Sequence, residues 1–291
     1  MRSKCRISLN NGRFDVLSTA SDGVMSNIRT IHLGNVEAGK KGPVFNIHID
    51  GIPEKVAHVE KEFGRNKVRT YAFADFNSGL ERAGYASLGG AGEVSVVVVI
   101  EANVPVSTMA RAAITANEAI TASLQDFGLR YGGINASGLV KQDITIVCKR
   151  SSDVSVRGAG NHSKMGELIG ASVIEAVKQS AHRNGMQLKK LTKLTEIMER
   201  AGVSREVLFR MSNAEEDTAD LNKFEYSAKY RVASTAVLHI LDCIEWGLIP
   251  EEEGTRAGHD IMKCCFDEES DSGCLKDALS KQVAAHLFEK R

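Results

Sequence analysis

The sequence lacks any excess of charge of one sign, and it lacks a hydrophobic run of membrane-spanning length. Among its 291 residues, Lys and Arg together number 37, as do Asp and Glu, so the formal net charge is zero. Nucleic-acid-binding proteins usually carry a basic excess or a basic stripe, and neither occurs here. The most apolar run, Val94 to Ala102, is interrupted by Ser95 and Glu101 and falls far short of roughly 20 residues. These absences argue against a nucleic-acid partner and against a membrane span.

Signals for export, disulfides and common catalytic motifs are missing as well. The basic start of the chain is followed by Arg6, Asn10 and Asn11 in place of an apolar signal core, so we expect a cytoplasmic protein. The six cysteines show no paired spacing, which favours reduced thiols. No CxxC pair accompanies His259, which disfavours a zinc site. No Gly-x-Ser-x-Gly elbow is present, which disfavours an ordinary serine hydrolase.

The first two thirds of the sequence show the alternation of strands and helices typical of an α/β protein. Apolar residues make up 43% of the chain, enough for a sizeable core. The β-branched run 94–100 suits a central strand covered on both faces. Helices are expected at 108–127 and 164–182, capped by Ser107 and Ser163. Other strands are expected at 5–9, 14–19, 28–33, 44–49, 68–76 and 143–148. The order predicts an α/β fold, a layered sheet with helices.

Beyond Gly185 the sequence shows only helical periodicity. The expected helices are 188–201, 204–211, 224–246, 258–266 and 275–289, with breaks at Pro250 and at 267–273. We therefore expect an all-helical C-terminal region, in which a helical extension of residues 186–291 follows an α/β domain of residues 1–185. Because Tyr230, Trp246 and their neighbours supply more apolar surface than a free helix exposes, the extension should pack on the core or on a second subunit.

Two segments carry polar residues that their expected local structure does not require. Arg111, Thr115 and Glu118 lie at i, i+4 and i+7 of the first helix and share one face, which is either a solvated face or the mouth of a site. Residues 132–138 form a loop of Gly and small polar residues. That loop is either a plain connection or a cradle whose N–H groups hold an anion or an oxyanion.

A third segment, residues 158–170, delivers His162 to the start of the second helix. Lys164 and Glu167 follow at helical spacing, and Gly166 and Gly170 lie at i, i+4 although each glycine lowers helix stability by roughly 1 kcal/mol relative to Ala. Close approach of backbone or ligand usually requires such glycines. An imidazole that titrates near neutrality can shuttle protons. The alternative is a histidine that only caps or hydrogen-bonds the helix start.

These segments resemble a known family. Residues 111–128, RAAITANEAITASLQDFG, and residues 159–170, AGNHSKMGELIG, are similar to two stretches of the adenosylcobinamide amidohydrolase (CbiZ) family, in the same order and at a similar separation. Near the start, residues 16–23, VLSTASDG, resemble a third stretch. The resemblance extends from about Phe14 to Ala181, and the helical region after Gly185 lies outside it.

The resemblance implies hydrolysis of one amide. Adenosylcobinamide would give adenosylcobyric acid and aminopropanol, a reaction of corrinoid (cobalamin) salvage on a small-molecule substrate, with no cofactor and no metal beyond the cobalt of the substrate. Such a reaction needs an activated water, donors to the oxyanion and an acid for the leaving amine. His162 is the first candidate for the acid or base, and Glu118 or Glu167 could orient it or activate water. The candidate substrate contacts are Arg111, Thr115, Ser137, Gly138, Asp143 and Lys164.

The chain also departs from the family pattern. The family's Thr-Gly-Thr-Gly-Thr-Asp run becomes residues 135–143, in which only Ser137, Gly138 and Asp143 correspond. Ile120 replaces a lysine, and Val24 replaces the second glycine of a pair. Three alternatives therefore stay open: a corrinoid- or tetrapyrrole-binding paralogue without hydrolysis, an amidohydrolase of another substrate, and a scaffold whose C-terminal helices form a homo-oligomer or partner interface.

The order of elements also predicts where the site lies. We expect the starts of both helices and the loop at Asn135 to lie at one edge of the sheet, where ligands of α/β proteins gather. Five candidate residues should then converge on one cleft: Thr115, Glu118, Ser137, His162 and Glu167.

Overall fold

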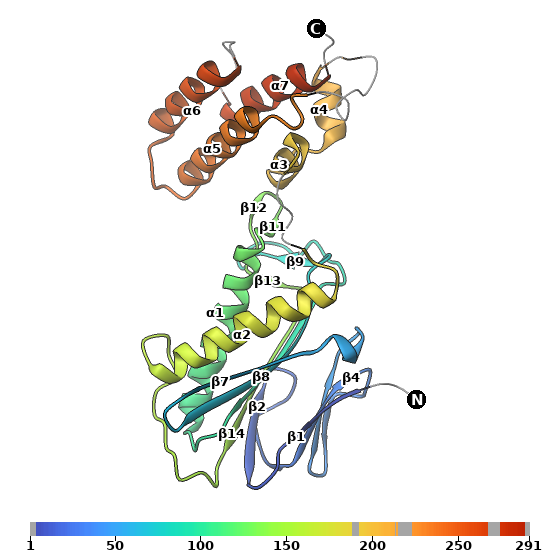
Figure 1. Ribbon diagram of the computed structural model, residues 1–291, viewed down its shortest axis with the longest axis vertical. Helices are drawn as coiled ribbons and strands as arrows, with labels where there is room; N and C mark the ends of the chain where they lie inside the picture. Colours follow the sequence, from blue (N-terminus) through green and yellow to red (C-terminus); the bar gives the residue numbers. More distant parts are fainter. Residues whose placement is uncertain (1–3, 188–191, 213, 215–222, 267–273, 289–291) are drawn as a thin grey trace. The chain divides into compact units, whose positions relative to one another are not determined.

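The protein is described here by a computed structural model that covers residues 4–187, 192–212, 214, 223–266 and 274–288. Its chain forms two compact units, one of Met1–Tyr131 with Asn135–Leu188 and one of Gly132–Ile134 with Lys189–Arg291. The first unit has a layered α/β architecture and the second is helical (Figure 1), which confirms the predicted fold class. Among the described helices, none combines the length and the apolar character needed to cross a membrane.

A six-stranded sheet forms the centre of the first unit, and its strand order is β3-β2-β14-β10-β8-β7. The two middle strands, β10 (Glu93–Ile100) and β14 (Lys141–Lys149), are parallel. Every residue of β10 is buried, as the β-branched run predicts for a central strand. The other four strands pair in antiparallel fashion: β2 (Phe14–Ser18), β3 (Val24–Ile28), β7 (Ala57–Phe63) and β8 (Asn66–Asp75).

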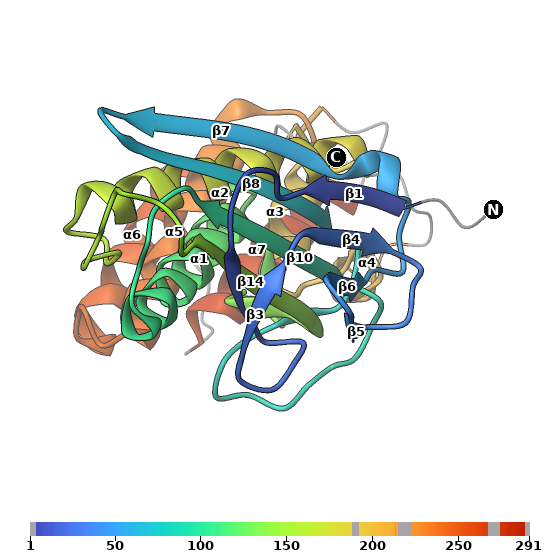
Figure 2. The ribbon, with the colours of Figure 1, turned by 90° about the horizontal axis from the view of Figure 1, so that it is seen from below.

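A smaller sheet covers one face of the large one (Figure 2). Its strand order is β1-β4-β6-β5, with β1 (Lys4–Ser8), β4 (Thr30–Gly34), β5 (Gly39–Lys41) and β6 (Val44–His48). A core that includes Val97 and Val147 of the large sheet and Phe45 and Ile47 of the small one fills the space between them. The single strand predicted at 28–33 is wrong, since β3 ends at Ile28 and β4 starts at Thr30. The chain leaves one sheet for the other at this point.

Two long helices, α1 (Val106–Asp126) and α2 (Lys164–Arg183), cover the opposite face of the large sheet. The predicted cap of α2 is confirmed, because Ser163 Oγ accepts a hydrogen bond from the N–H of Gly166 at 3.0 Å. The predicted cap of α1 is wrong. Pro105 is the N-cap residue, and the N–H groups of Thr108 and Met109 both donate to its carbonyl oxygen, so Ser107 lies inside the first turn.

Short elements complete the connections of the first unit. The 3-10 helix η1 (Pro53–Lys55) precedes β7. The strand β9 (Leu80–Glu81) pairs with β13 (Gly138–Leu139) in antiparallel fashion, and β11 (Arg130–Tyr131) and β12 (Ile134–Asn135) lie between α1 and β13. The segment that precedes β14 is therefore tied to the segment that precedes β10.

The helical unit has its own apolar core. Its helices are α3 (Leu194–Arg200), α4 (Arg205–Ser212), α5 (Ala228–Glu245), α6 (Glu251–Phe266) and α7 (Leu275–Phe288). The predicted starts at 258 and 224 are wrong, because α6 begins directly after Pro250 and α5 begins only after Ser227. Residues 188–191 of the predicted helix 188–201 and the predicted break at 267–273 lie outside the described residues.

Candidate functional site

The loop between β14 and α2 runs along α1 and contacts the three polar residues that share one helix face. Thr115 is buried, and its hydroxyl donates to the carbonyl oxygen of Ala159 at 2.8 Å. Farther along, the side-chain amide of Asn161 donates to the carboxylate of Glu118. Arg111 Cδ lies 3.5 Å from the position that a Cβ on Gly160 would take. This face of α1 is thus partly covered by the loop that carries His162.

His162 sits on this loop with an exposed side chain. Its ring packs against the backbone of Gly160, where a Cβ would lie 3.1 Å from Cε1 of the imidazole. The loop is fixed on both sides of this contact, since the N–H and the hydroxyl of Ser163 each donate to the carbonyl oxygen of Gly160 at 2.8 Å. Within the described part of the chain the imidazole makes no hydrogen bond, so its nitrogens can meet a ligand.

The next two candidates lie on α2 and pair with each other. Lys164 Nζ is 2.5 Å from a carboxylate oxygen of Glu167, and the ammonium also lies 4.7 Å from the centre of the Phe63 ring, at the end of β7. The structure therefore brings this pair to the β7 side of α2. Among the described contacts, none joins Glu167 to Glu118 or to His162. Because Glu167 is one turn into its helix, its side chain reaches back to Lys164 and not to the loop.

The loop at Asn135 does not lie at the edge that the sequence predicts. It precedes β14, whereas the loop with His162 follows β14, so the two loops leave opposite ends of that strand. The Ser137 hydroxyl oxygen accepts a hydrogen bond from the N–H of Ala83 at 2.8 Å, and Gly138 belongs to β13. Both residues are held by the segment that precedes β10.

The two loops nevertheless reach neighbouring turns of α1. The hydroxyl of Thr121 donates to the carbonyl oxygen of Ser137 at 2.8 Å, and the side-chain amide of Gln142 donates to Asn117 Oδ1 at 2.5 Å. Glu118, which follows Asn117 in α1, accepts a hydrogen bond from Asn161. Sequence reasoning missed Asn117, Thr121 and Gln142 as site residues. The i, i+4 spacing of Asn117 and Thr121 within the longer motif was the available signal.

Asp143 belongs to the other face of the sheet. Side chains alternate along β14, and Ile144 packs in the core under the helices while Val147 packs in the core under the small sheet, so Asp143 shares the face of Val147. There its carboxylate accepts a hydrogen bond from the hydroxyl of Thr19 at 3.3 Å. The sheet separates Asp143 from His162, and Asp143 therefore joins the segment 16–23 instead.

Charged groups cluster around the start of β14. Lys141 Nζ lies 2.8 Å from the buried carboxylate of Glu93 and 3.1 Å from that of Asp50. Burial opposes the charge on Lys141, but the hydrogen bonds to Glu93 and Asp50 outweigh it and raise the pKa of the ammonium. Hydrogen bonds from His48 and Lys141 lower the pKa of Asp50. The cluster holds the start of β14 in place.

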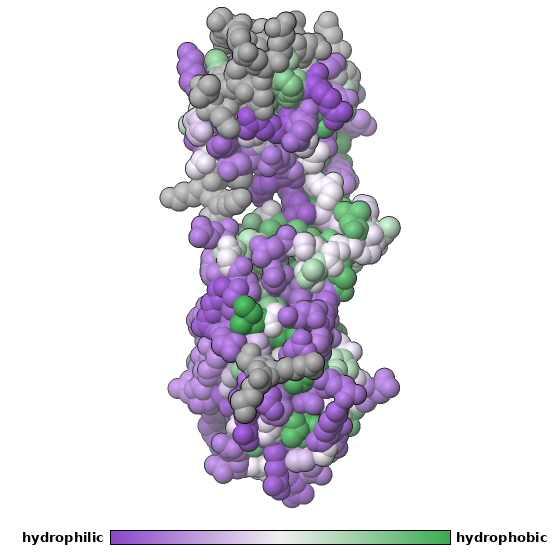
Figure 3. Space-filling model, turned by 90° about the vertical axis from the view of Figure 1, so that its right-hand side faces the viewer, coloured by the Kyte–Doolittle hydropathy of each residue, from purple (hydrophilic) through white to green (hydrophobic). Residues whose placement is uncertain are grey.

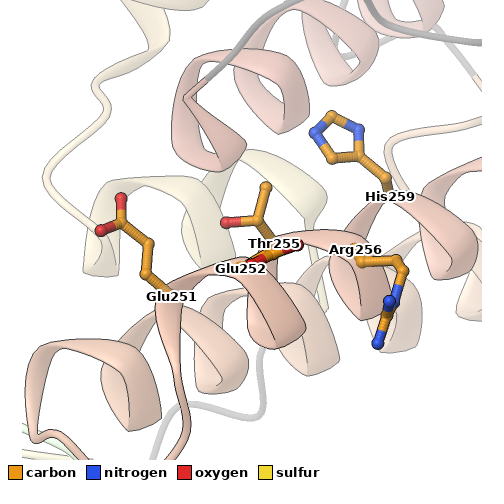
Figure 4. Close-up of a pocket in the computed structure, with 5 residues that line it drawn as sticks. All are labelled: Glu251, Glu252, Thr255, Arg256 and His259. Atoms are coloured by element: carbon orange, nitrogen blue, oxygen red, sulfur yellow. The ribbon is translucent and has the colours of Figure 1, made fainter.

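A surface hollow lies along α6 in the helical unit. The described residues that line it are Glu251, Glu252, Thr255, Arg256 and His259, all from that one helix. Figure 4 shows Glu251, Thr255 and His259 rising from the same side of α6, while Arg256 points the other way. Within the described chain, no three His, Cys, Asp or Glu side chains are placed to hold a metal ion.

Comparison with known proteins finds two similarities, both to part of this chain. An 89-residue stretch of the chain is 34% identical to an uncharacterized protein of Methanocaldococcus jannaschii. The matched stretch makes up 30% of this chain and 34% of that protein. The chain thus spans about a third of the length of the curated relative that it matches. Residues 53–188 match the model of the family described as CbiZ, adenosylcobinamide amidohydrolase. This segment contains α1, α2 and the loop with His162, but not residues 16–23. Residues 53–188 are therefore similar to the adenosylcobinamide amidohydrolase family, as the two longer motifs predict.

Proposed function

We propose that this protein hydrolyses the aminopropanol amide of adenosylcobinamide, releasing adenosylcobyric acid and aminopropanol in corrinoid salvage. The family match supports this reaction class. The observation that carries the proposal within this chain is the contact of Asn161 with Glu118, which sets a carboxylate beside the loop of the exposed His162. The chemistry belongs to residues 1–185 in this proposal, and the helical extension 186–291 is accessory and the place of any homo-oligomer contact.

Each step of the hydrolysis has a candidate group. His162 takes a proton from the attacking water and returns it to the departing amine, as general acid–base groups do. Glu118, fixed by the amide of Asn161, orients the imidazole or the water. The Ser137 hydroxyl oxygen accepts from Ala83, so its own proton stays available to the substrate. Arg111 and Lys164 supply charged donors to amide oxygens on the substrate rim, and Thr115 positions the loop through Ala159.

The direct test is incubation with adenosylcobinamide, followed by chromatographic separation of the corrinoids and detection of free aminopropanol. His162→Ala should lower turnover by about two orders of magnitude or more, with an unchanged melting temperature. His259→Ala is the matched control, since that histidine lines the α6 hollow outside the family match. If turnover of His162→Ala stays within roughly threefold of the parent, the loss is far smaller than that of a general acid–base group. That result would contradict the proposed role of His162.

A second candidate is corrinoid binding without hydrolysis. It is favoured by the segment 135–143, which departs from the family run. Saturable binding of adenosylcobinamide with no release of aminopropanol would select this candidate over hydrolysis.

A further inference from the structure

The segment between β9 and β10, residues 82–92, exposes apolar side chains close to the candidate site. Tyr85 is 57% exposed and Leu88 is 69% exposed. Hydrophilic residues dominate the face drawn in Figure 3, and hydrophobic residues occur there only in small groups. Single exposed apolar residues are ordinary on protein surfaces. Two exposed apolar side chains on one loop indicate a binding surface when the loop is rigid, because a rigid loop cannot rearrange to bury them.

Hydrogen bonds fix the tip of this loop. The Ser87 hydroxyl donates to the carboxylate of Glu81 at 2.6 Å, and the Tyr131 hydroxyl donates to the carbonyl oxygen of Ala86. The rings of Tyr85 and Tyr131 are 5.9 Å apart between centroids. The backbone and the polar groups of the tip are therefore held in place, while the outer side of the Tyr85 ring stays in solvent.

The base of the loop is closed by glycines in direct backbone contact. A Cβ on Gly90 would lie 2.5 Å from the backbone nitrogen of Gly79, and one on Gly92 would lie 2.0 Å from the carbonyl oxygen of Ser78. Gly90 also has a φ of +124°, which side chains other than glycine rarely adopt. A larger residue at either position would overlap the backbone of Ser78 or Gly79, so the two glycines allow the loop base to close in this shape.

This rigid loop adjoins the residues already assigned to the substrate. The N–H of Ala83 donates to the Ser137 hydroxyl oxygen, and Arg82 donates to the carbonyl oxygen of Asn135 at 3.1 Å. The carbonyl oxygen of Ser137 in turn accepts from Thr121, one turn of α1 beyond Glu118. A ligand that contacts the Ser137 loop therefore has the apolar tip beside it.

We infer that Tyr85 and Leu88 contact the apolar face of the substrate ring system and set the affinity for it. The inference rests on the proposed function, because its ligand is the corrinoid. A corrin offers a broad, nearly flat face with amide groups around its rim. An aromatic ring and an aliphatic side chain on a preorganised loop suit the face, since binding orders nothing further. The neighbouring polar loop suits the rim.

The test compares affinities of surface variants for adenosylcobinamide, measured by equilibrium dialysis with the visible absorbance of the corrinoid. The double variant Tyr85→Ser with Leu88→Ser should raise Kd by about tenfold or more, as loss of buried anchor residues does. Tyr85→Phe should bind like the parent because the ring face is retained. Leu248→Ser is the matched control, since Leu248 is 68% exposed but lies in the helical unit. Its Kd should not change.

The outcomes separate this inference from the proposed hydrolysis. A Kd of the double variant within about twofold of the parent overturns the inference, and so does an equal rise in Leu248→Ser. If the parent binds the corrinoid but releases no aminopropanol, hydrolysis fails while the affinity ratio still decides the role of the loop. If the parent binds no corrinoid at all, both the proposed function and the inferred role of Tyr85 and Leu88 are wrong.

Discussion

Gly166 and Gly170 lie four residues apart on α2, yet their surroundings predict different effects of substitution by alanine. A Cβ on Gly166 would lie 2.0 Å from the carbonyl oxygen of Gly160 and 2.5 Å from its carbonyl carbon, whereas a Cβ on Gly170 has no atom within 4 Å. Both substitutions gain helix propensity of about 1 kcal/mol. Because that gain is common to both variants, it cancels in their difference.

What remains in the difference is the overlap at Gly166. The loop of His162 must move away from α2 by about 1 Å or more, and inserting volume into a packed contact costs about 1–3 kcal/mol. Gly170→Ala should therefore be more stable than the parent by about 1 kcal/mol, and Gly166→Ala should lie about 1–3 kcal/mol below Gly170→Ala. For a unit of this size, 1 kcal/mol corresponds to roughly 2–4 °C in melting temperature.

Thermal unfolding of the two variants followed by circular dichroism measures this difference directly. Turnover adds a second readout, because only Gly166→Ala displaces the backbone that carries His162. Equal melting temperatures and equal turnover in the two variants would refute the reasoning, since the shared helix propensity leaves no other source for a difference.

Three further substitutions test the supports of the site and the helical unit. Ser163→Ala removes the cap of α2 and should cost about 0.5–2 kcal/mol in urea unfolding, whereas Ser163→Asp should retain most of it. Thr115→Val keeps the shape but leaves the Ala159 carbonyl oxygen without its donor, and should cost about 1–3 kcal/mol by the same measurement. Glu225 is fully buried, and burial raises its pKa. Since its folded-state pKa exceeds the ordinary value of 4.5, its contribution is largest below that pH and is lost as pH rises through the folded pKa. Glu225→Gln should therefore flatten the pH dependence and stabilise the helical unit near pH 7, and a less stable variant at that pH contradicts this sign.

Regular periodicity is what made much of the fold predictable from the sequence. The run 94–100 is buried on both faces, and the helix with Met109 and Ile120 buries the stripe that its spacing predicts. The start of α6 was missed because the acidic residues after Pro250 were assigned to the break that precedes the helix. In the structure Gly254 and Gly258 are contact points of α6, where a Cβ would lie 2.7 Å from Ile244 and 2.5 Å from Leu275. A single sequence does not show which neighbour requires a glycine.

The site was less predictable because its contacts are long-range. The bond between Asn161 and Glu118 joins residues 43 positions apart, and neither local spacing nor charge pattern encodes it. The placement of Asp143 was accessible in principle, because the alternation of side chains along its strand already assigns it to the face opposite Ile144. The expected single edge failed for a related reason, since loops before and after one strand leave its two ends.

The helix α1 contacts both of these loops, although they leave opposite ends of β14. It runs back over β14, and the loop that follows β14 accompanies it from Thr108, which donates to the carbonyl oxygen of Arg157, to Glu118. Ten helical residues correspond to about 15 Å, so the loop returns over much of the strand length before it reaches α2. Thr121, one turn farther, receives the loop that precedes β14. One rigid helix thus fixes the spacing between the proposed acid–base group and the proposed substrate loop, which is the preorganisation that a catalytic site requires.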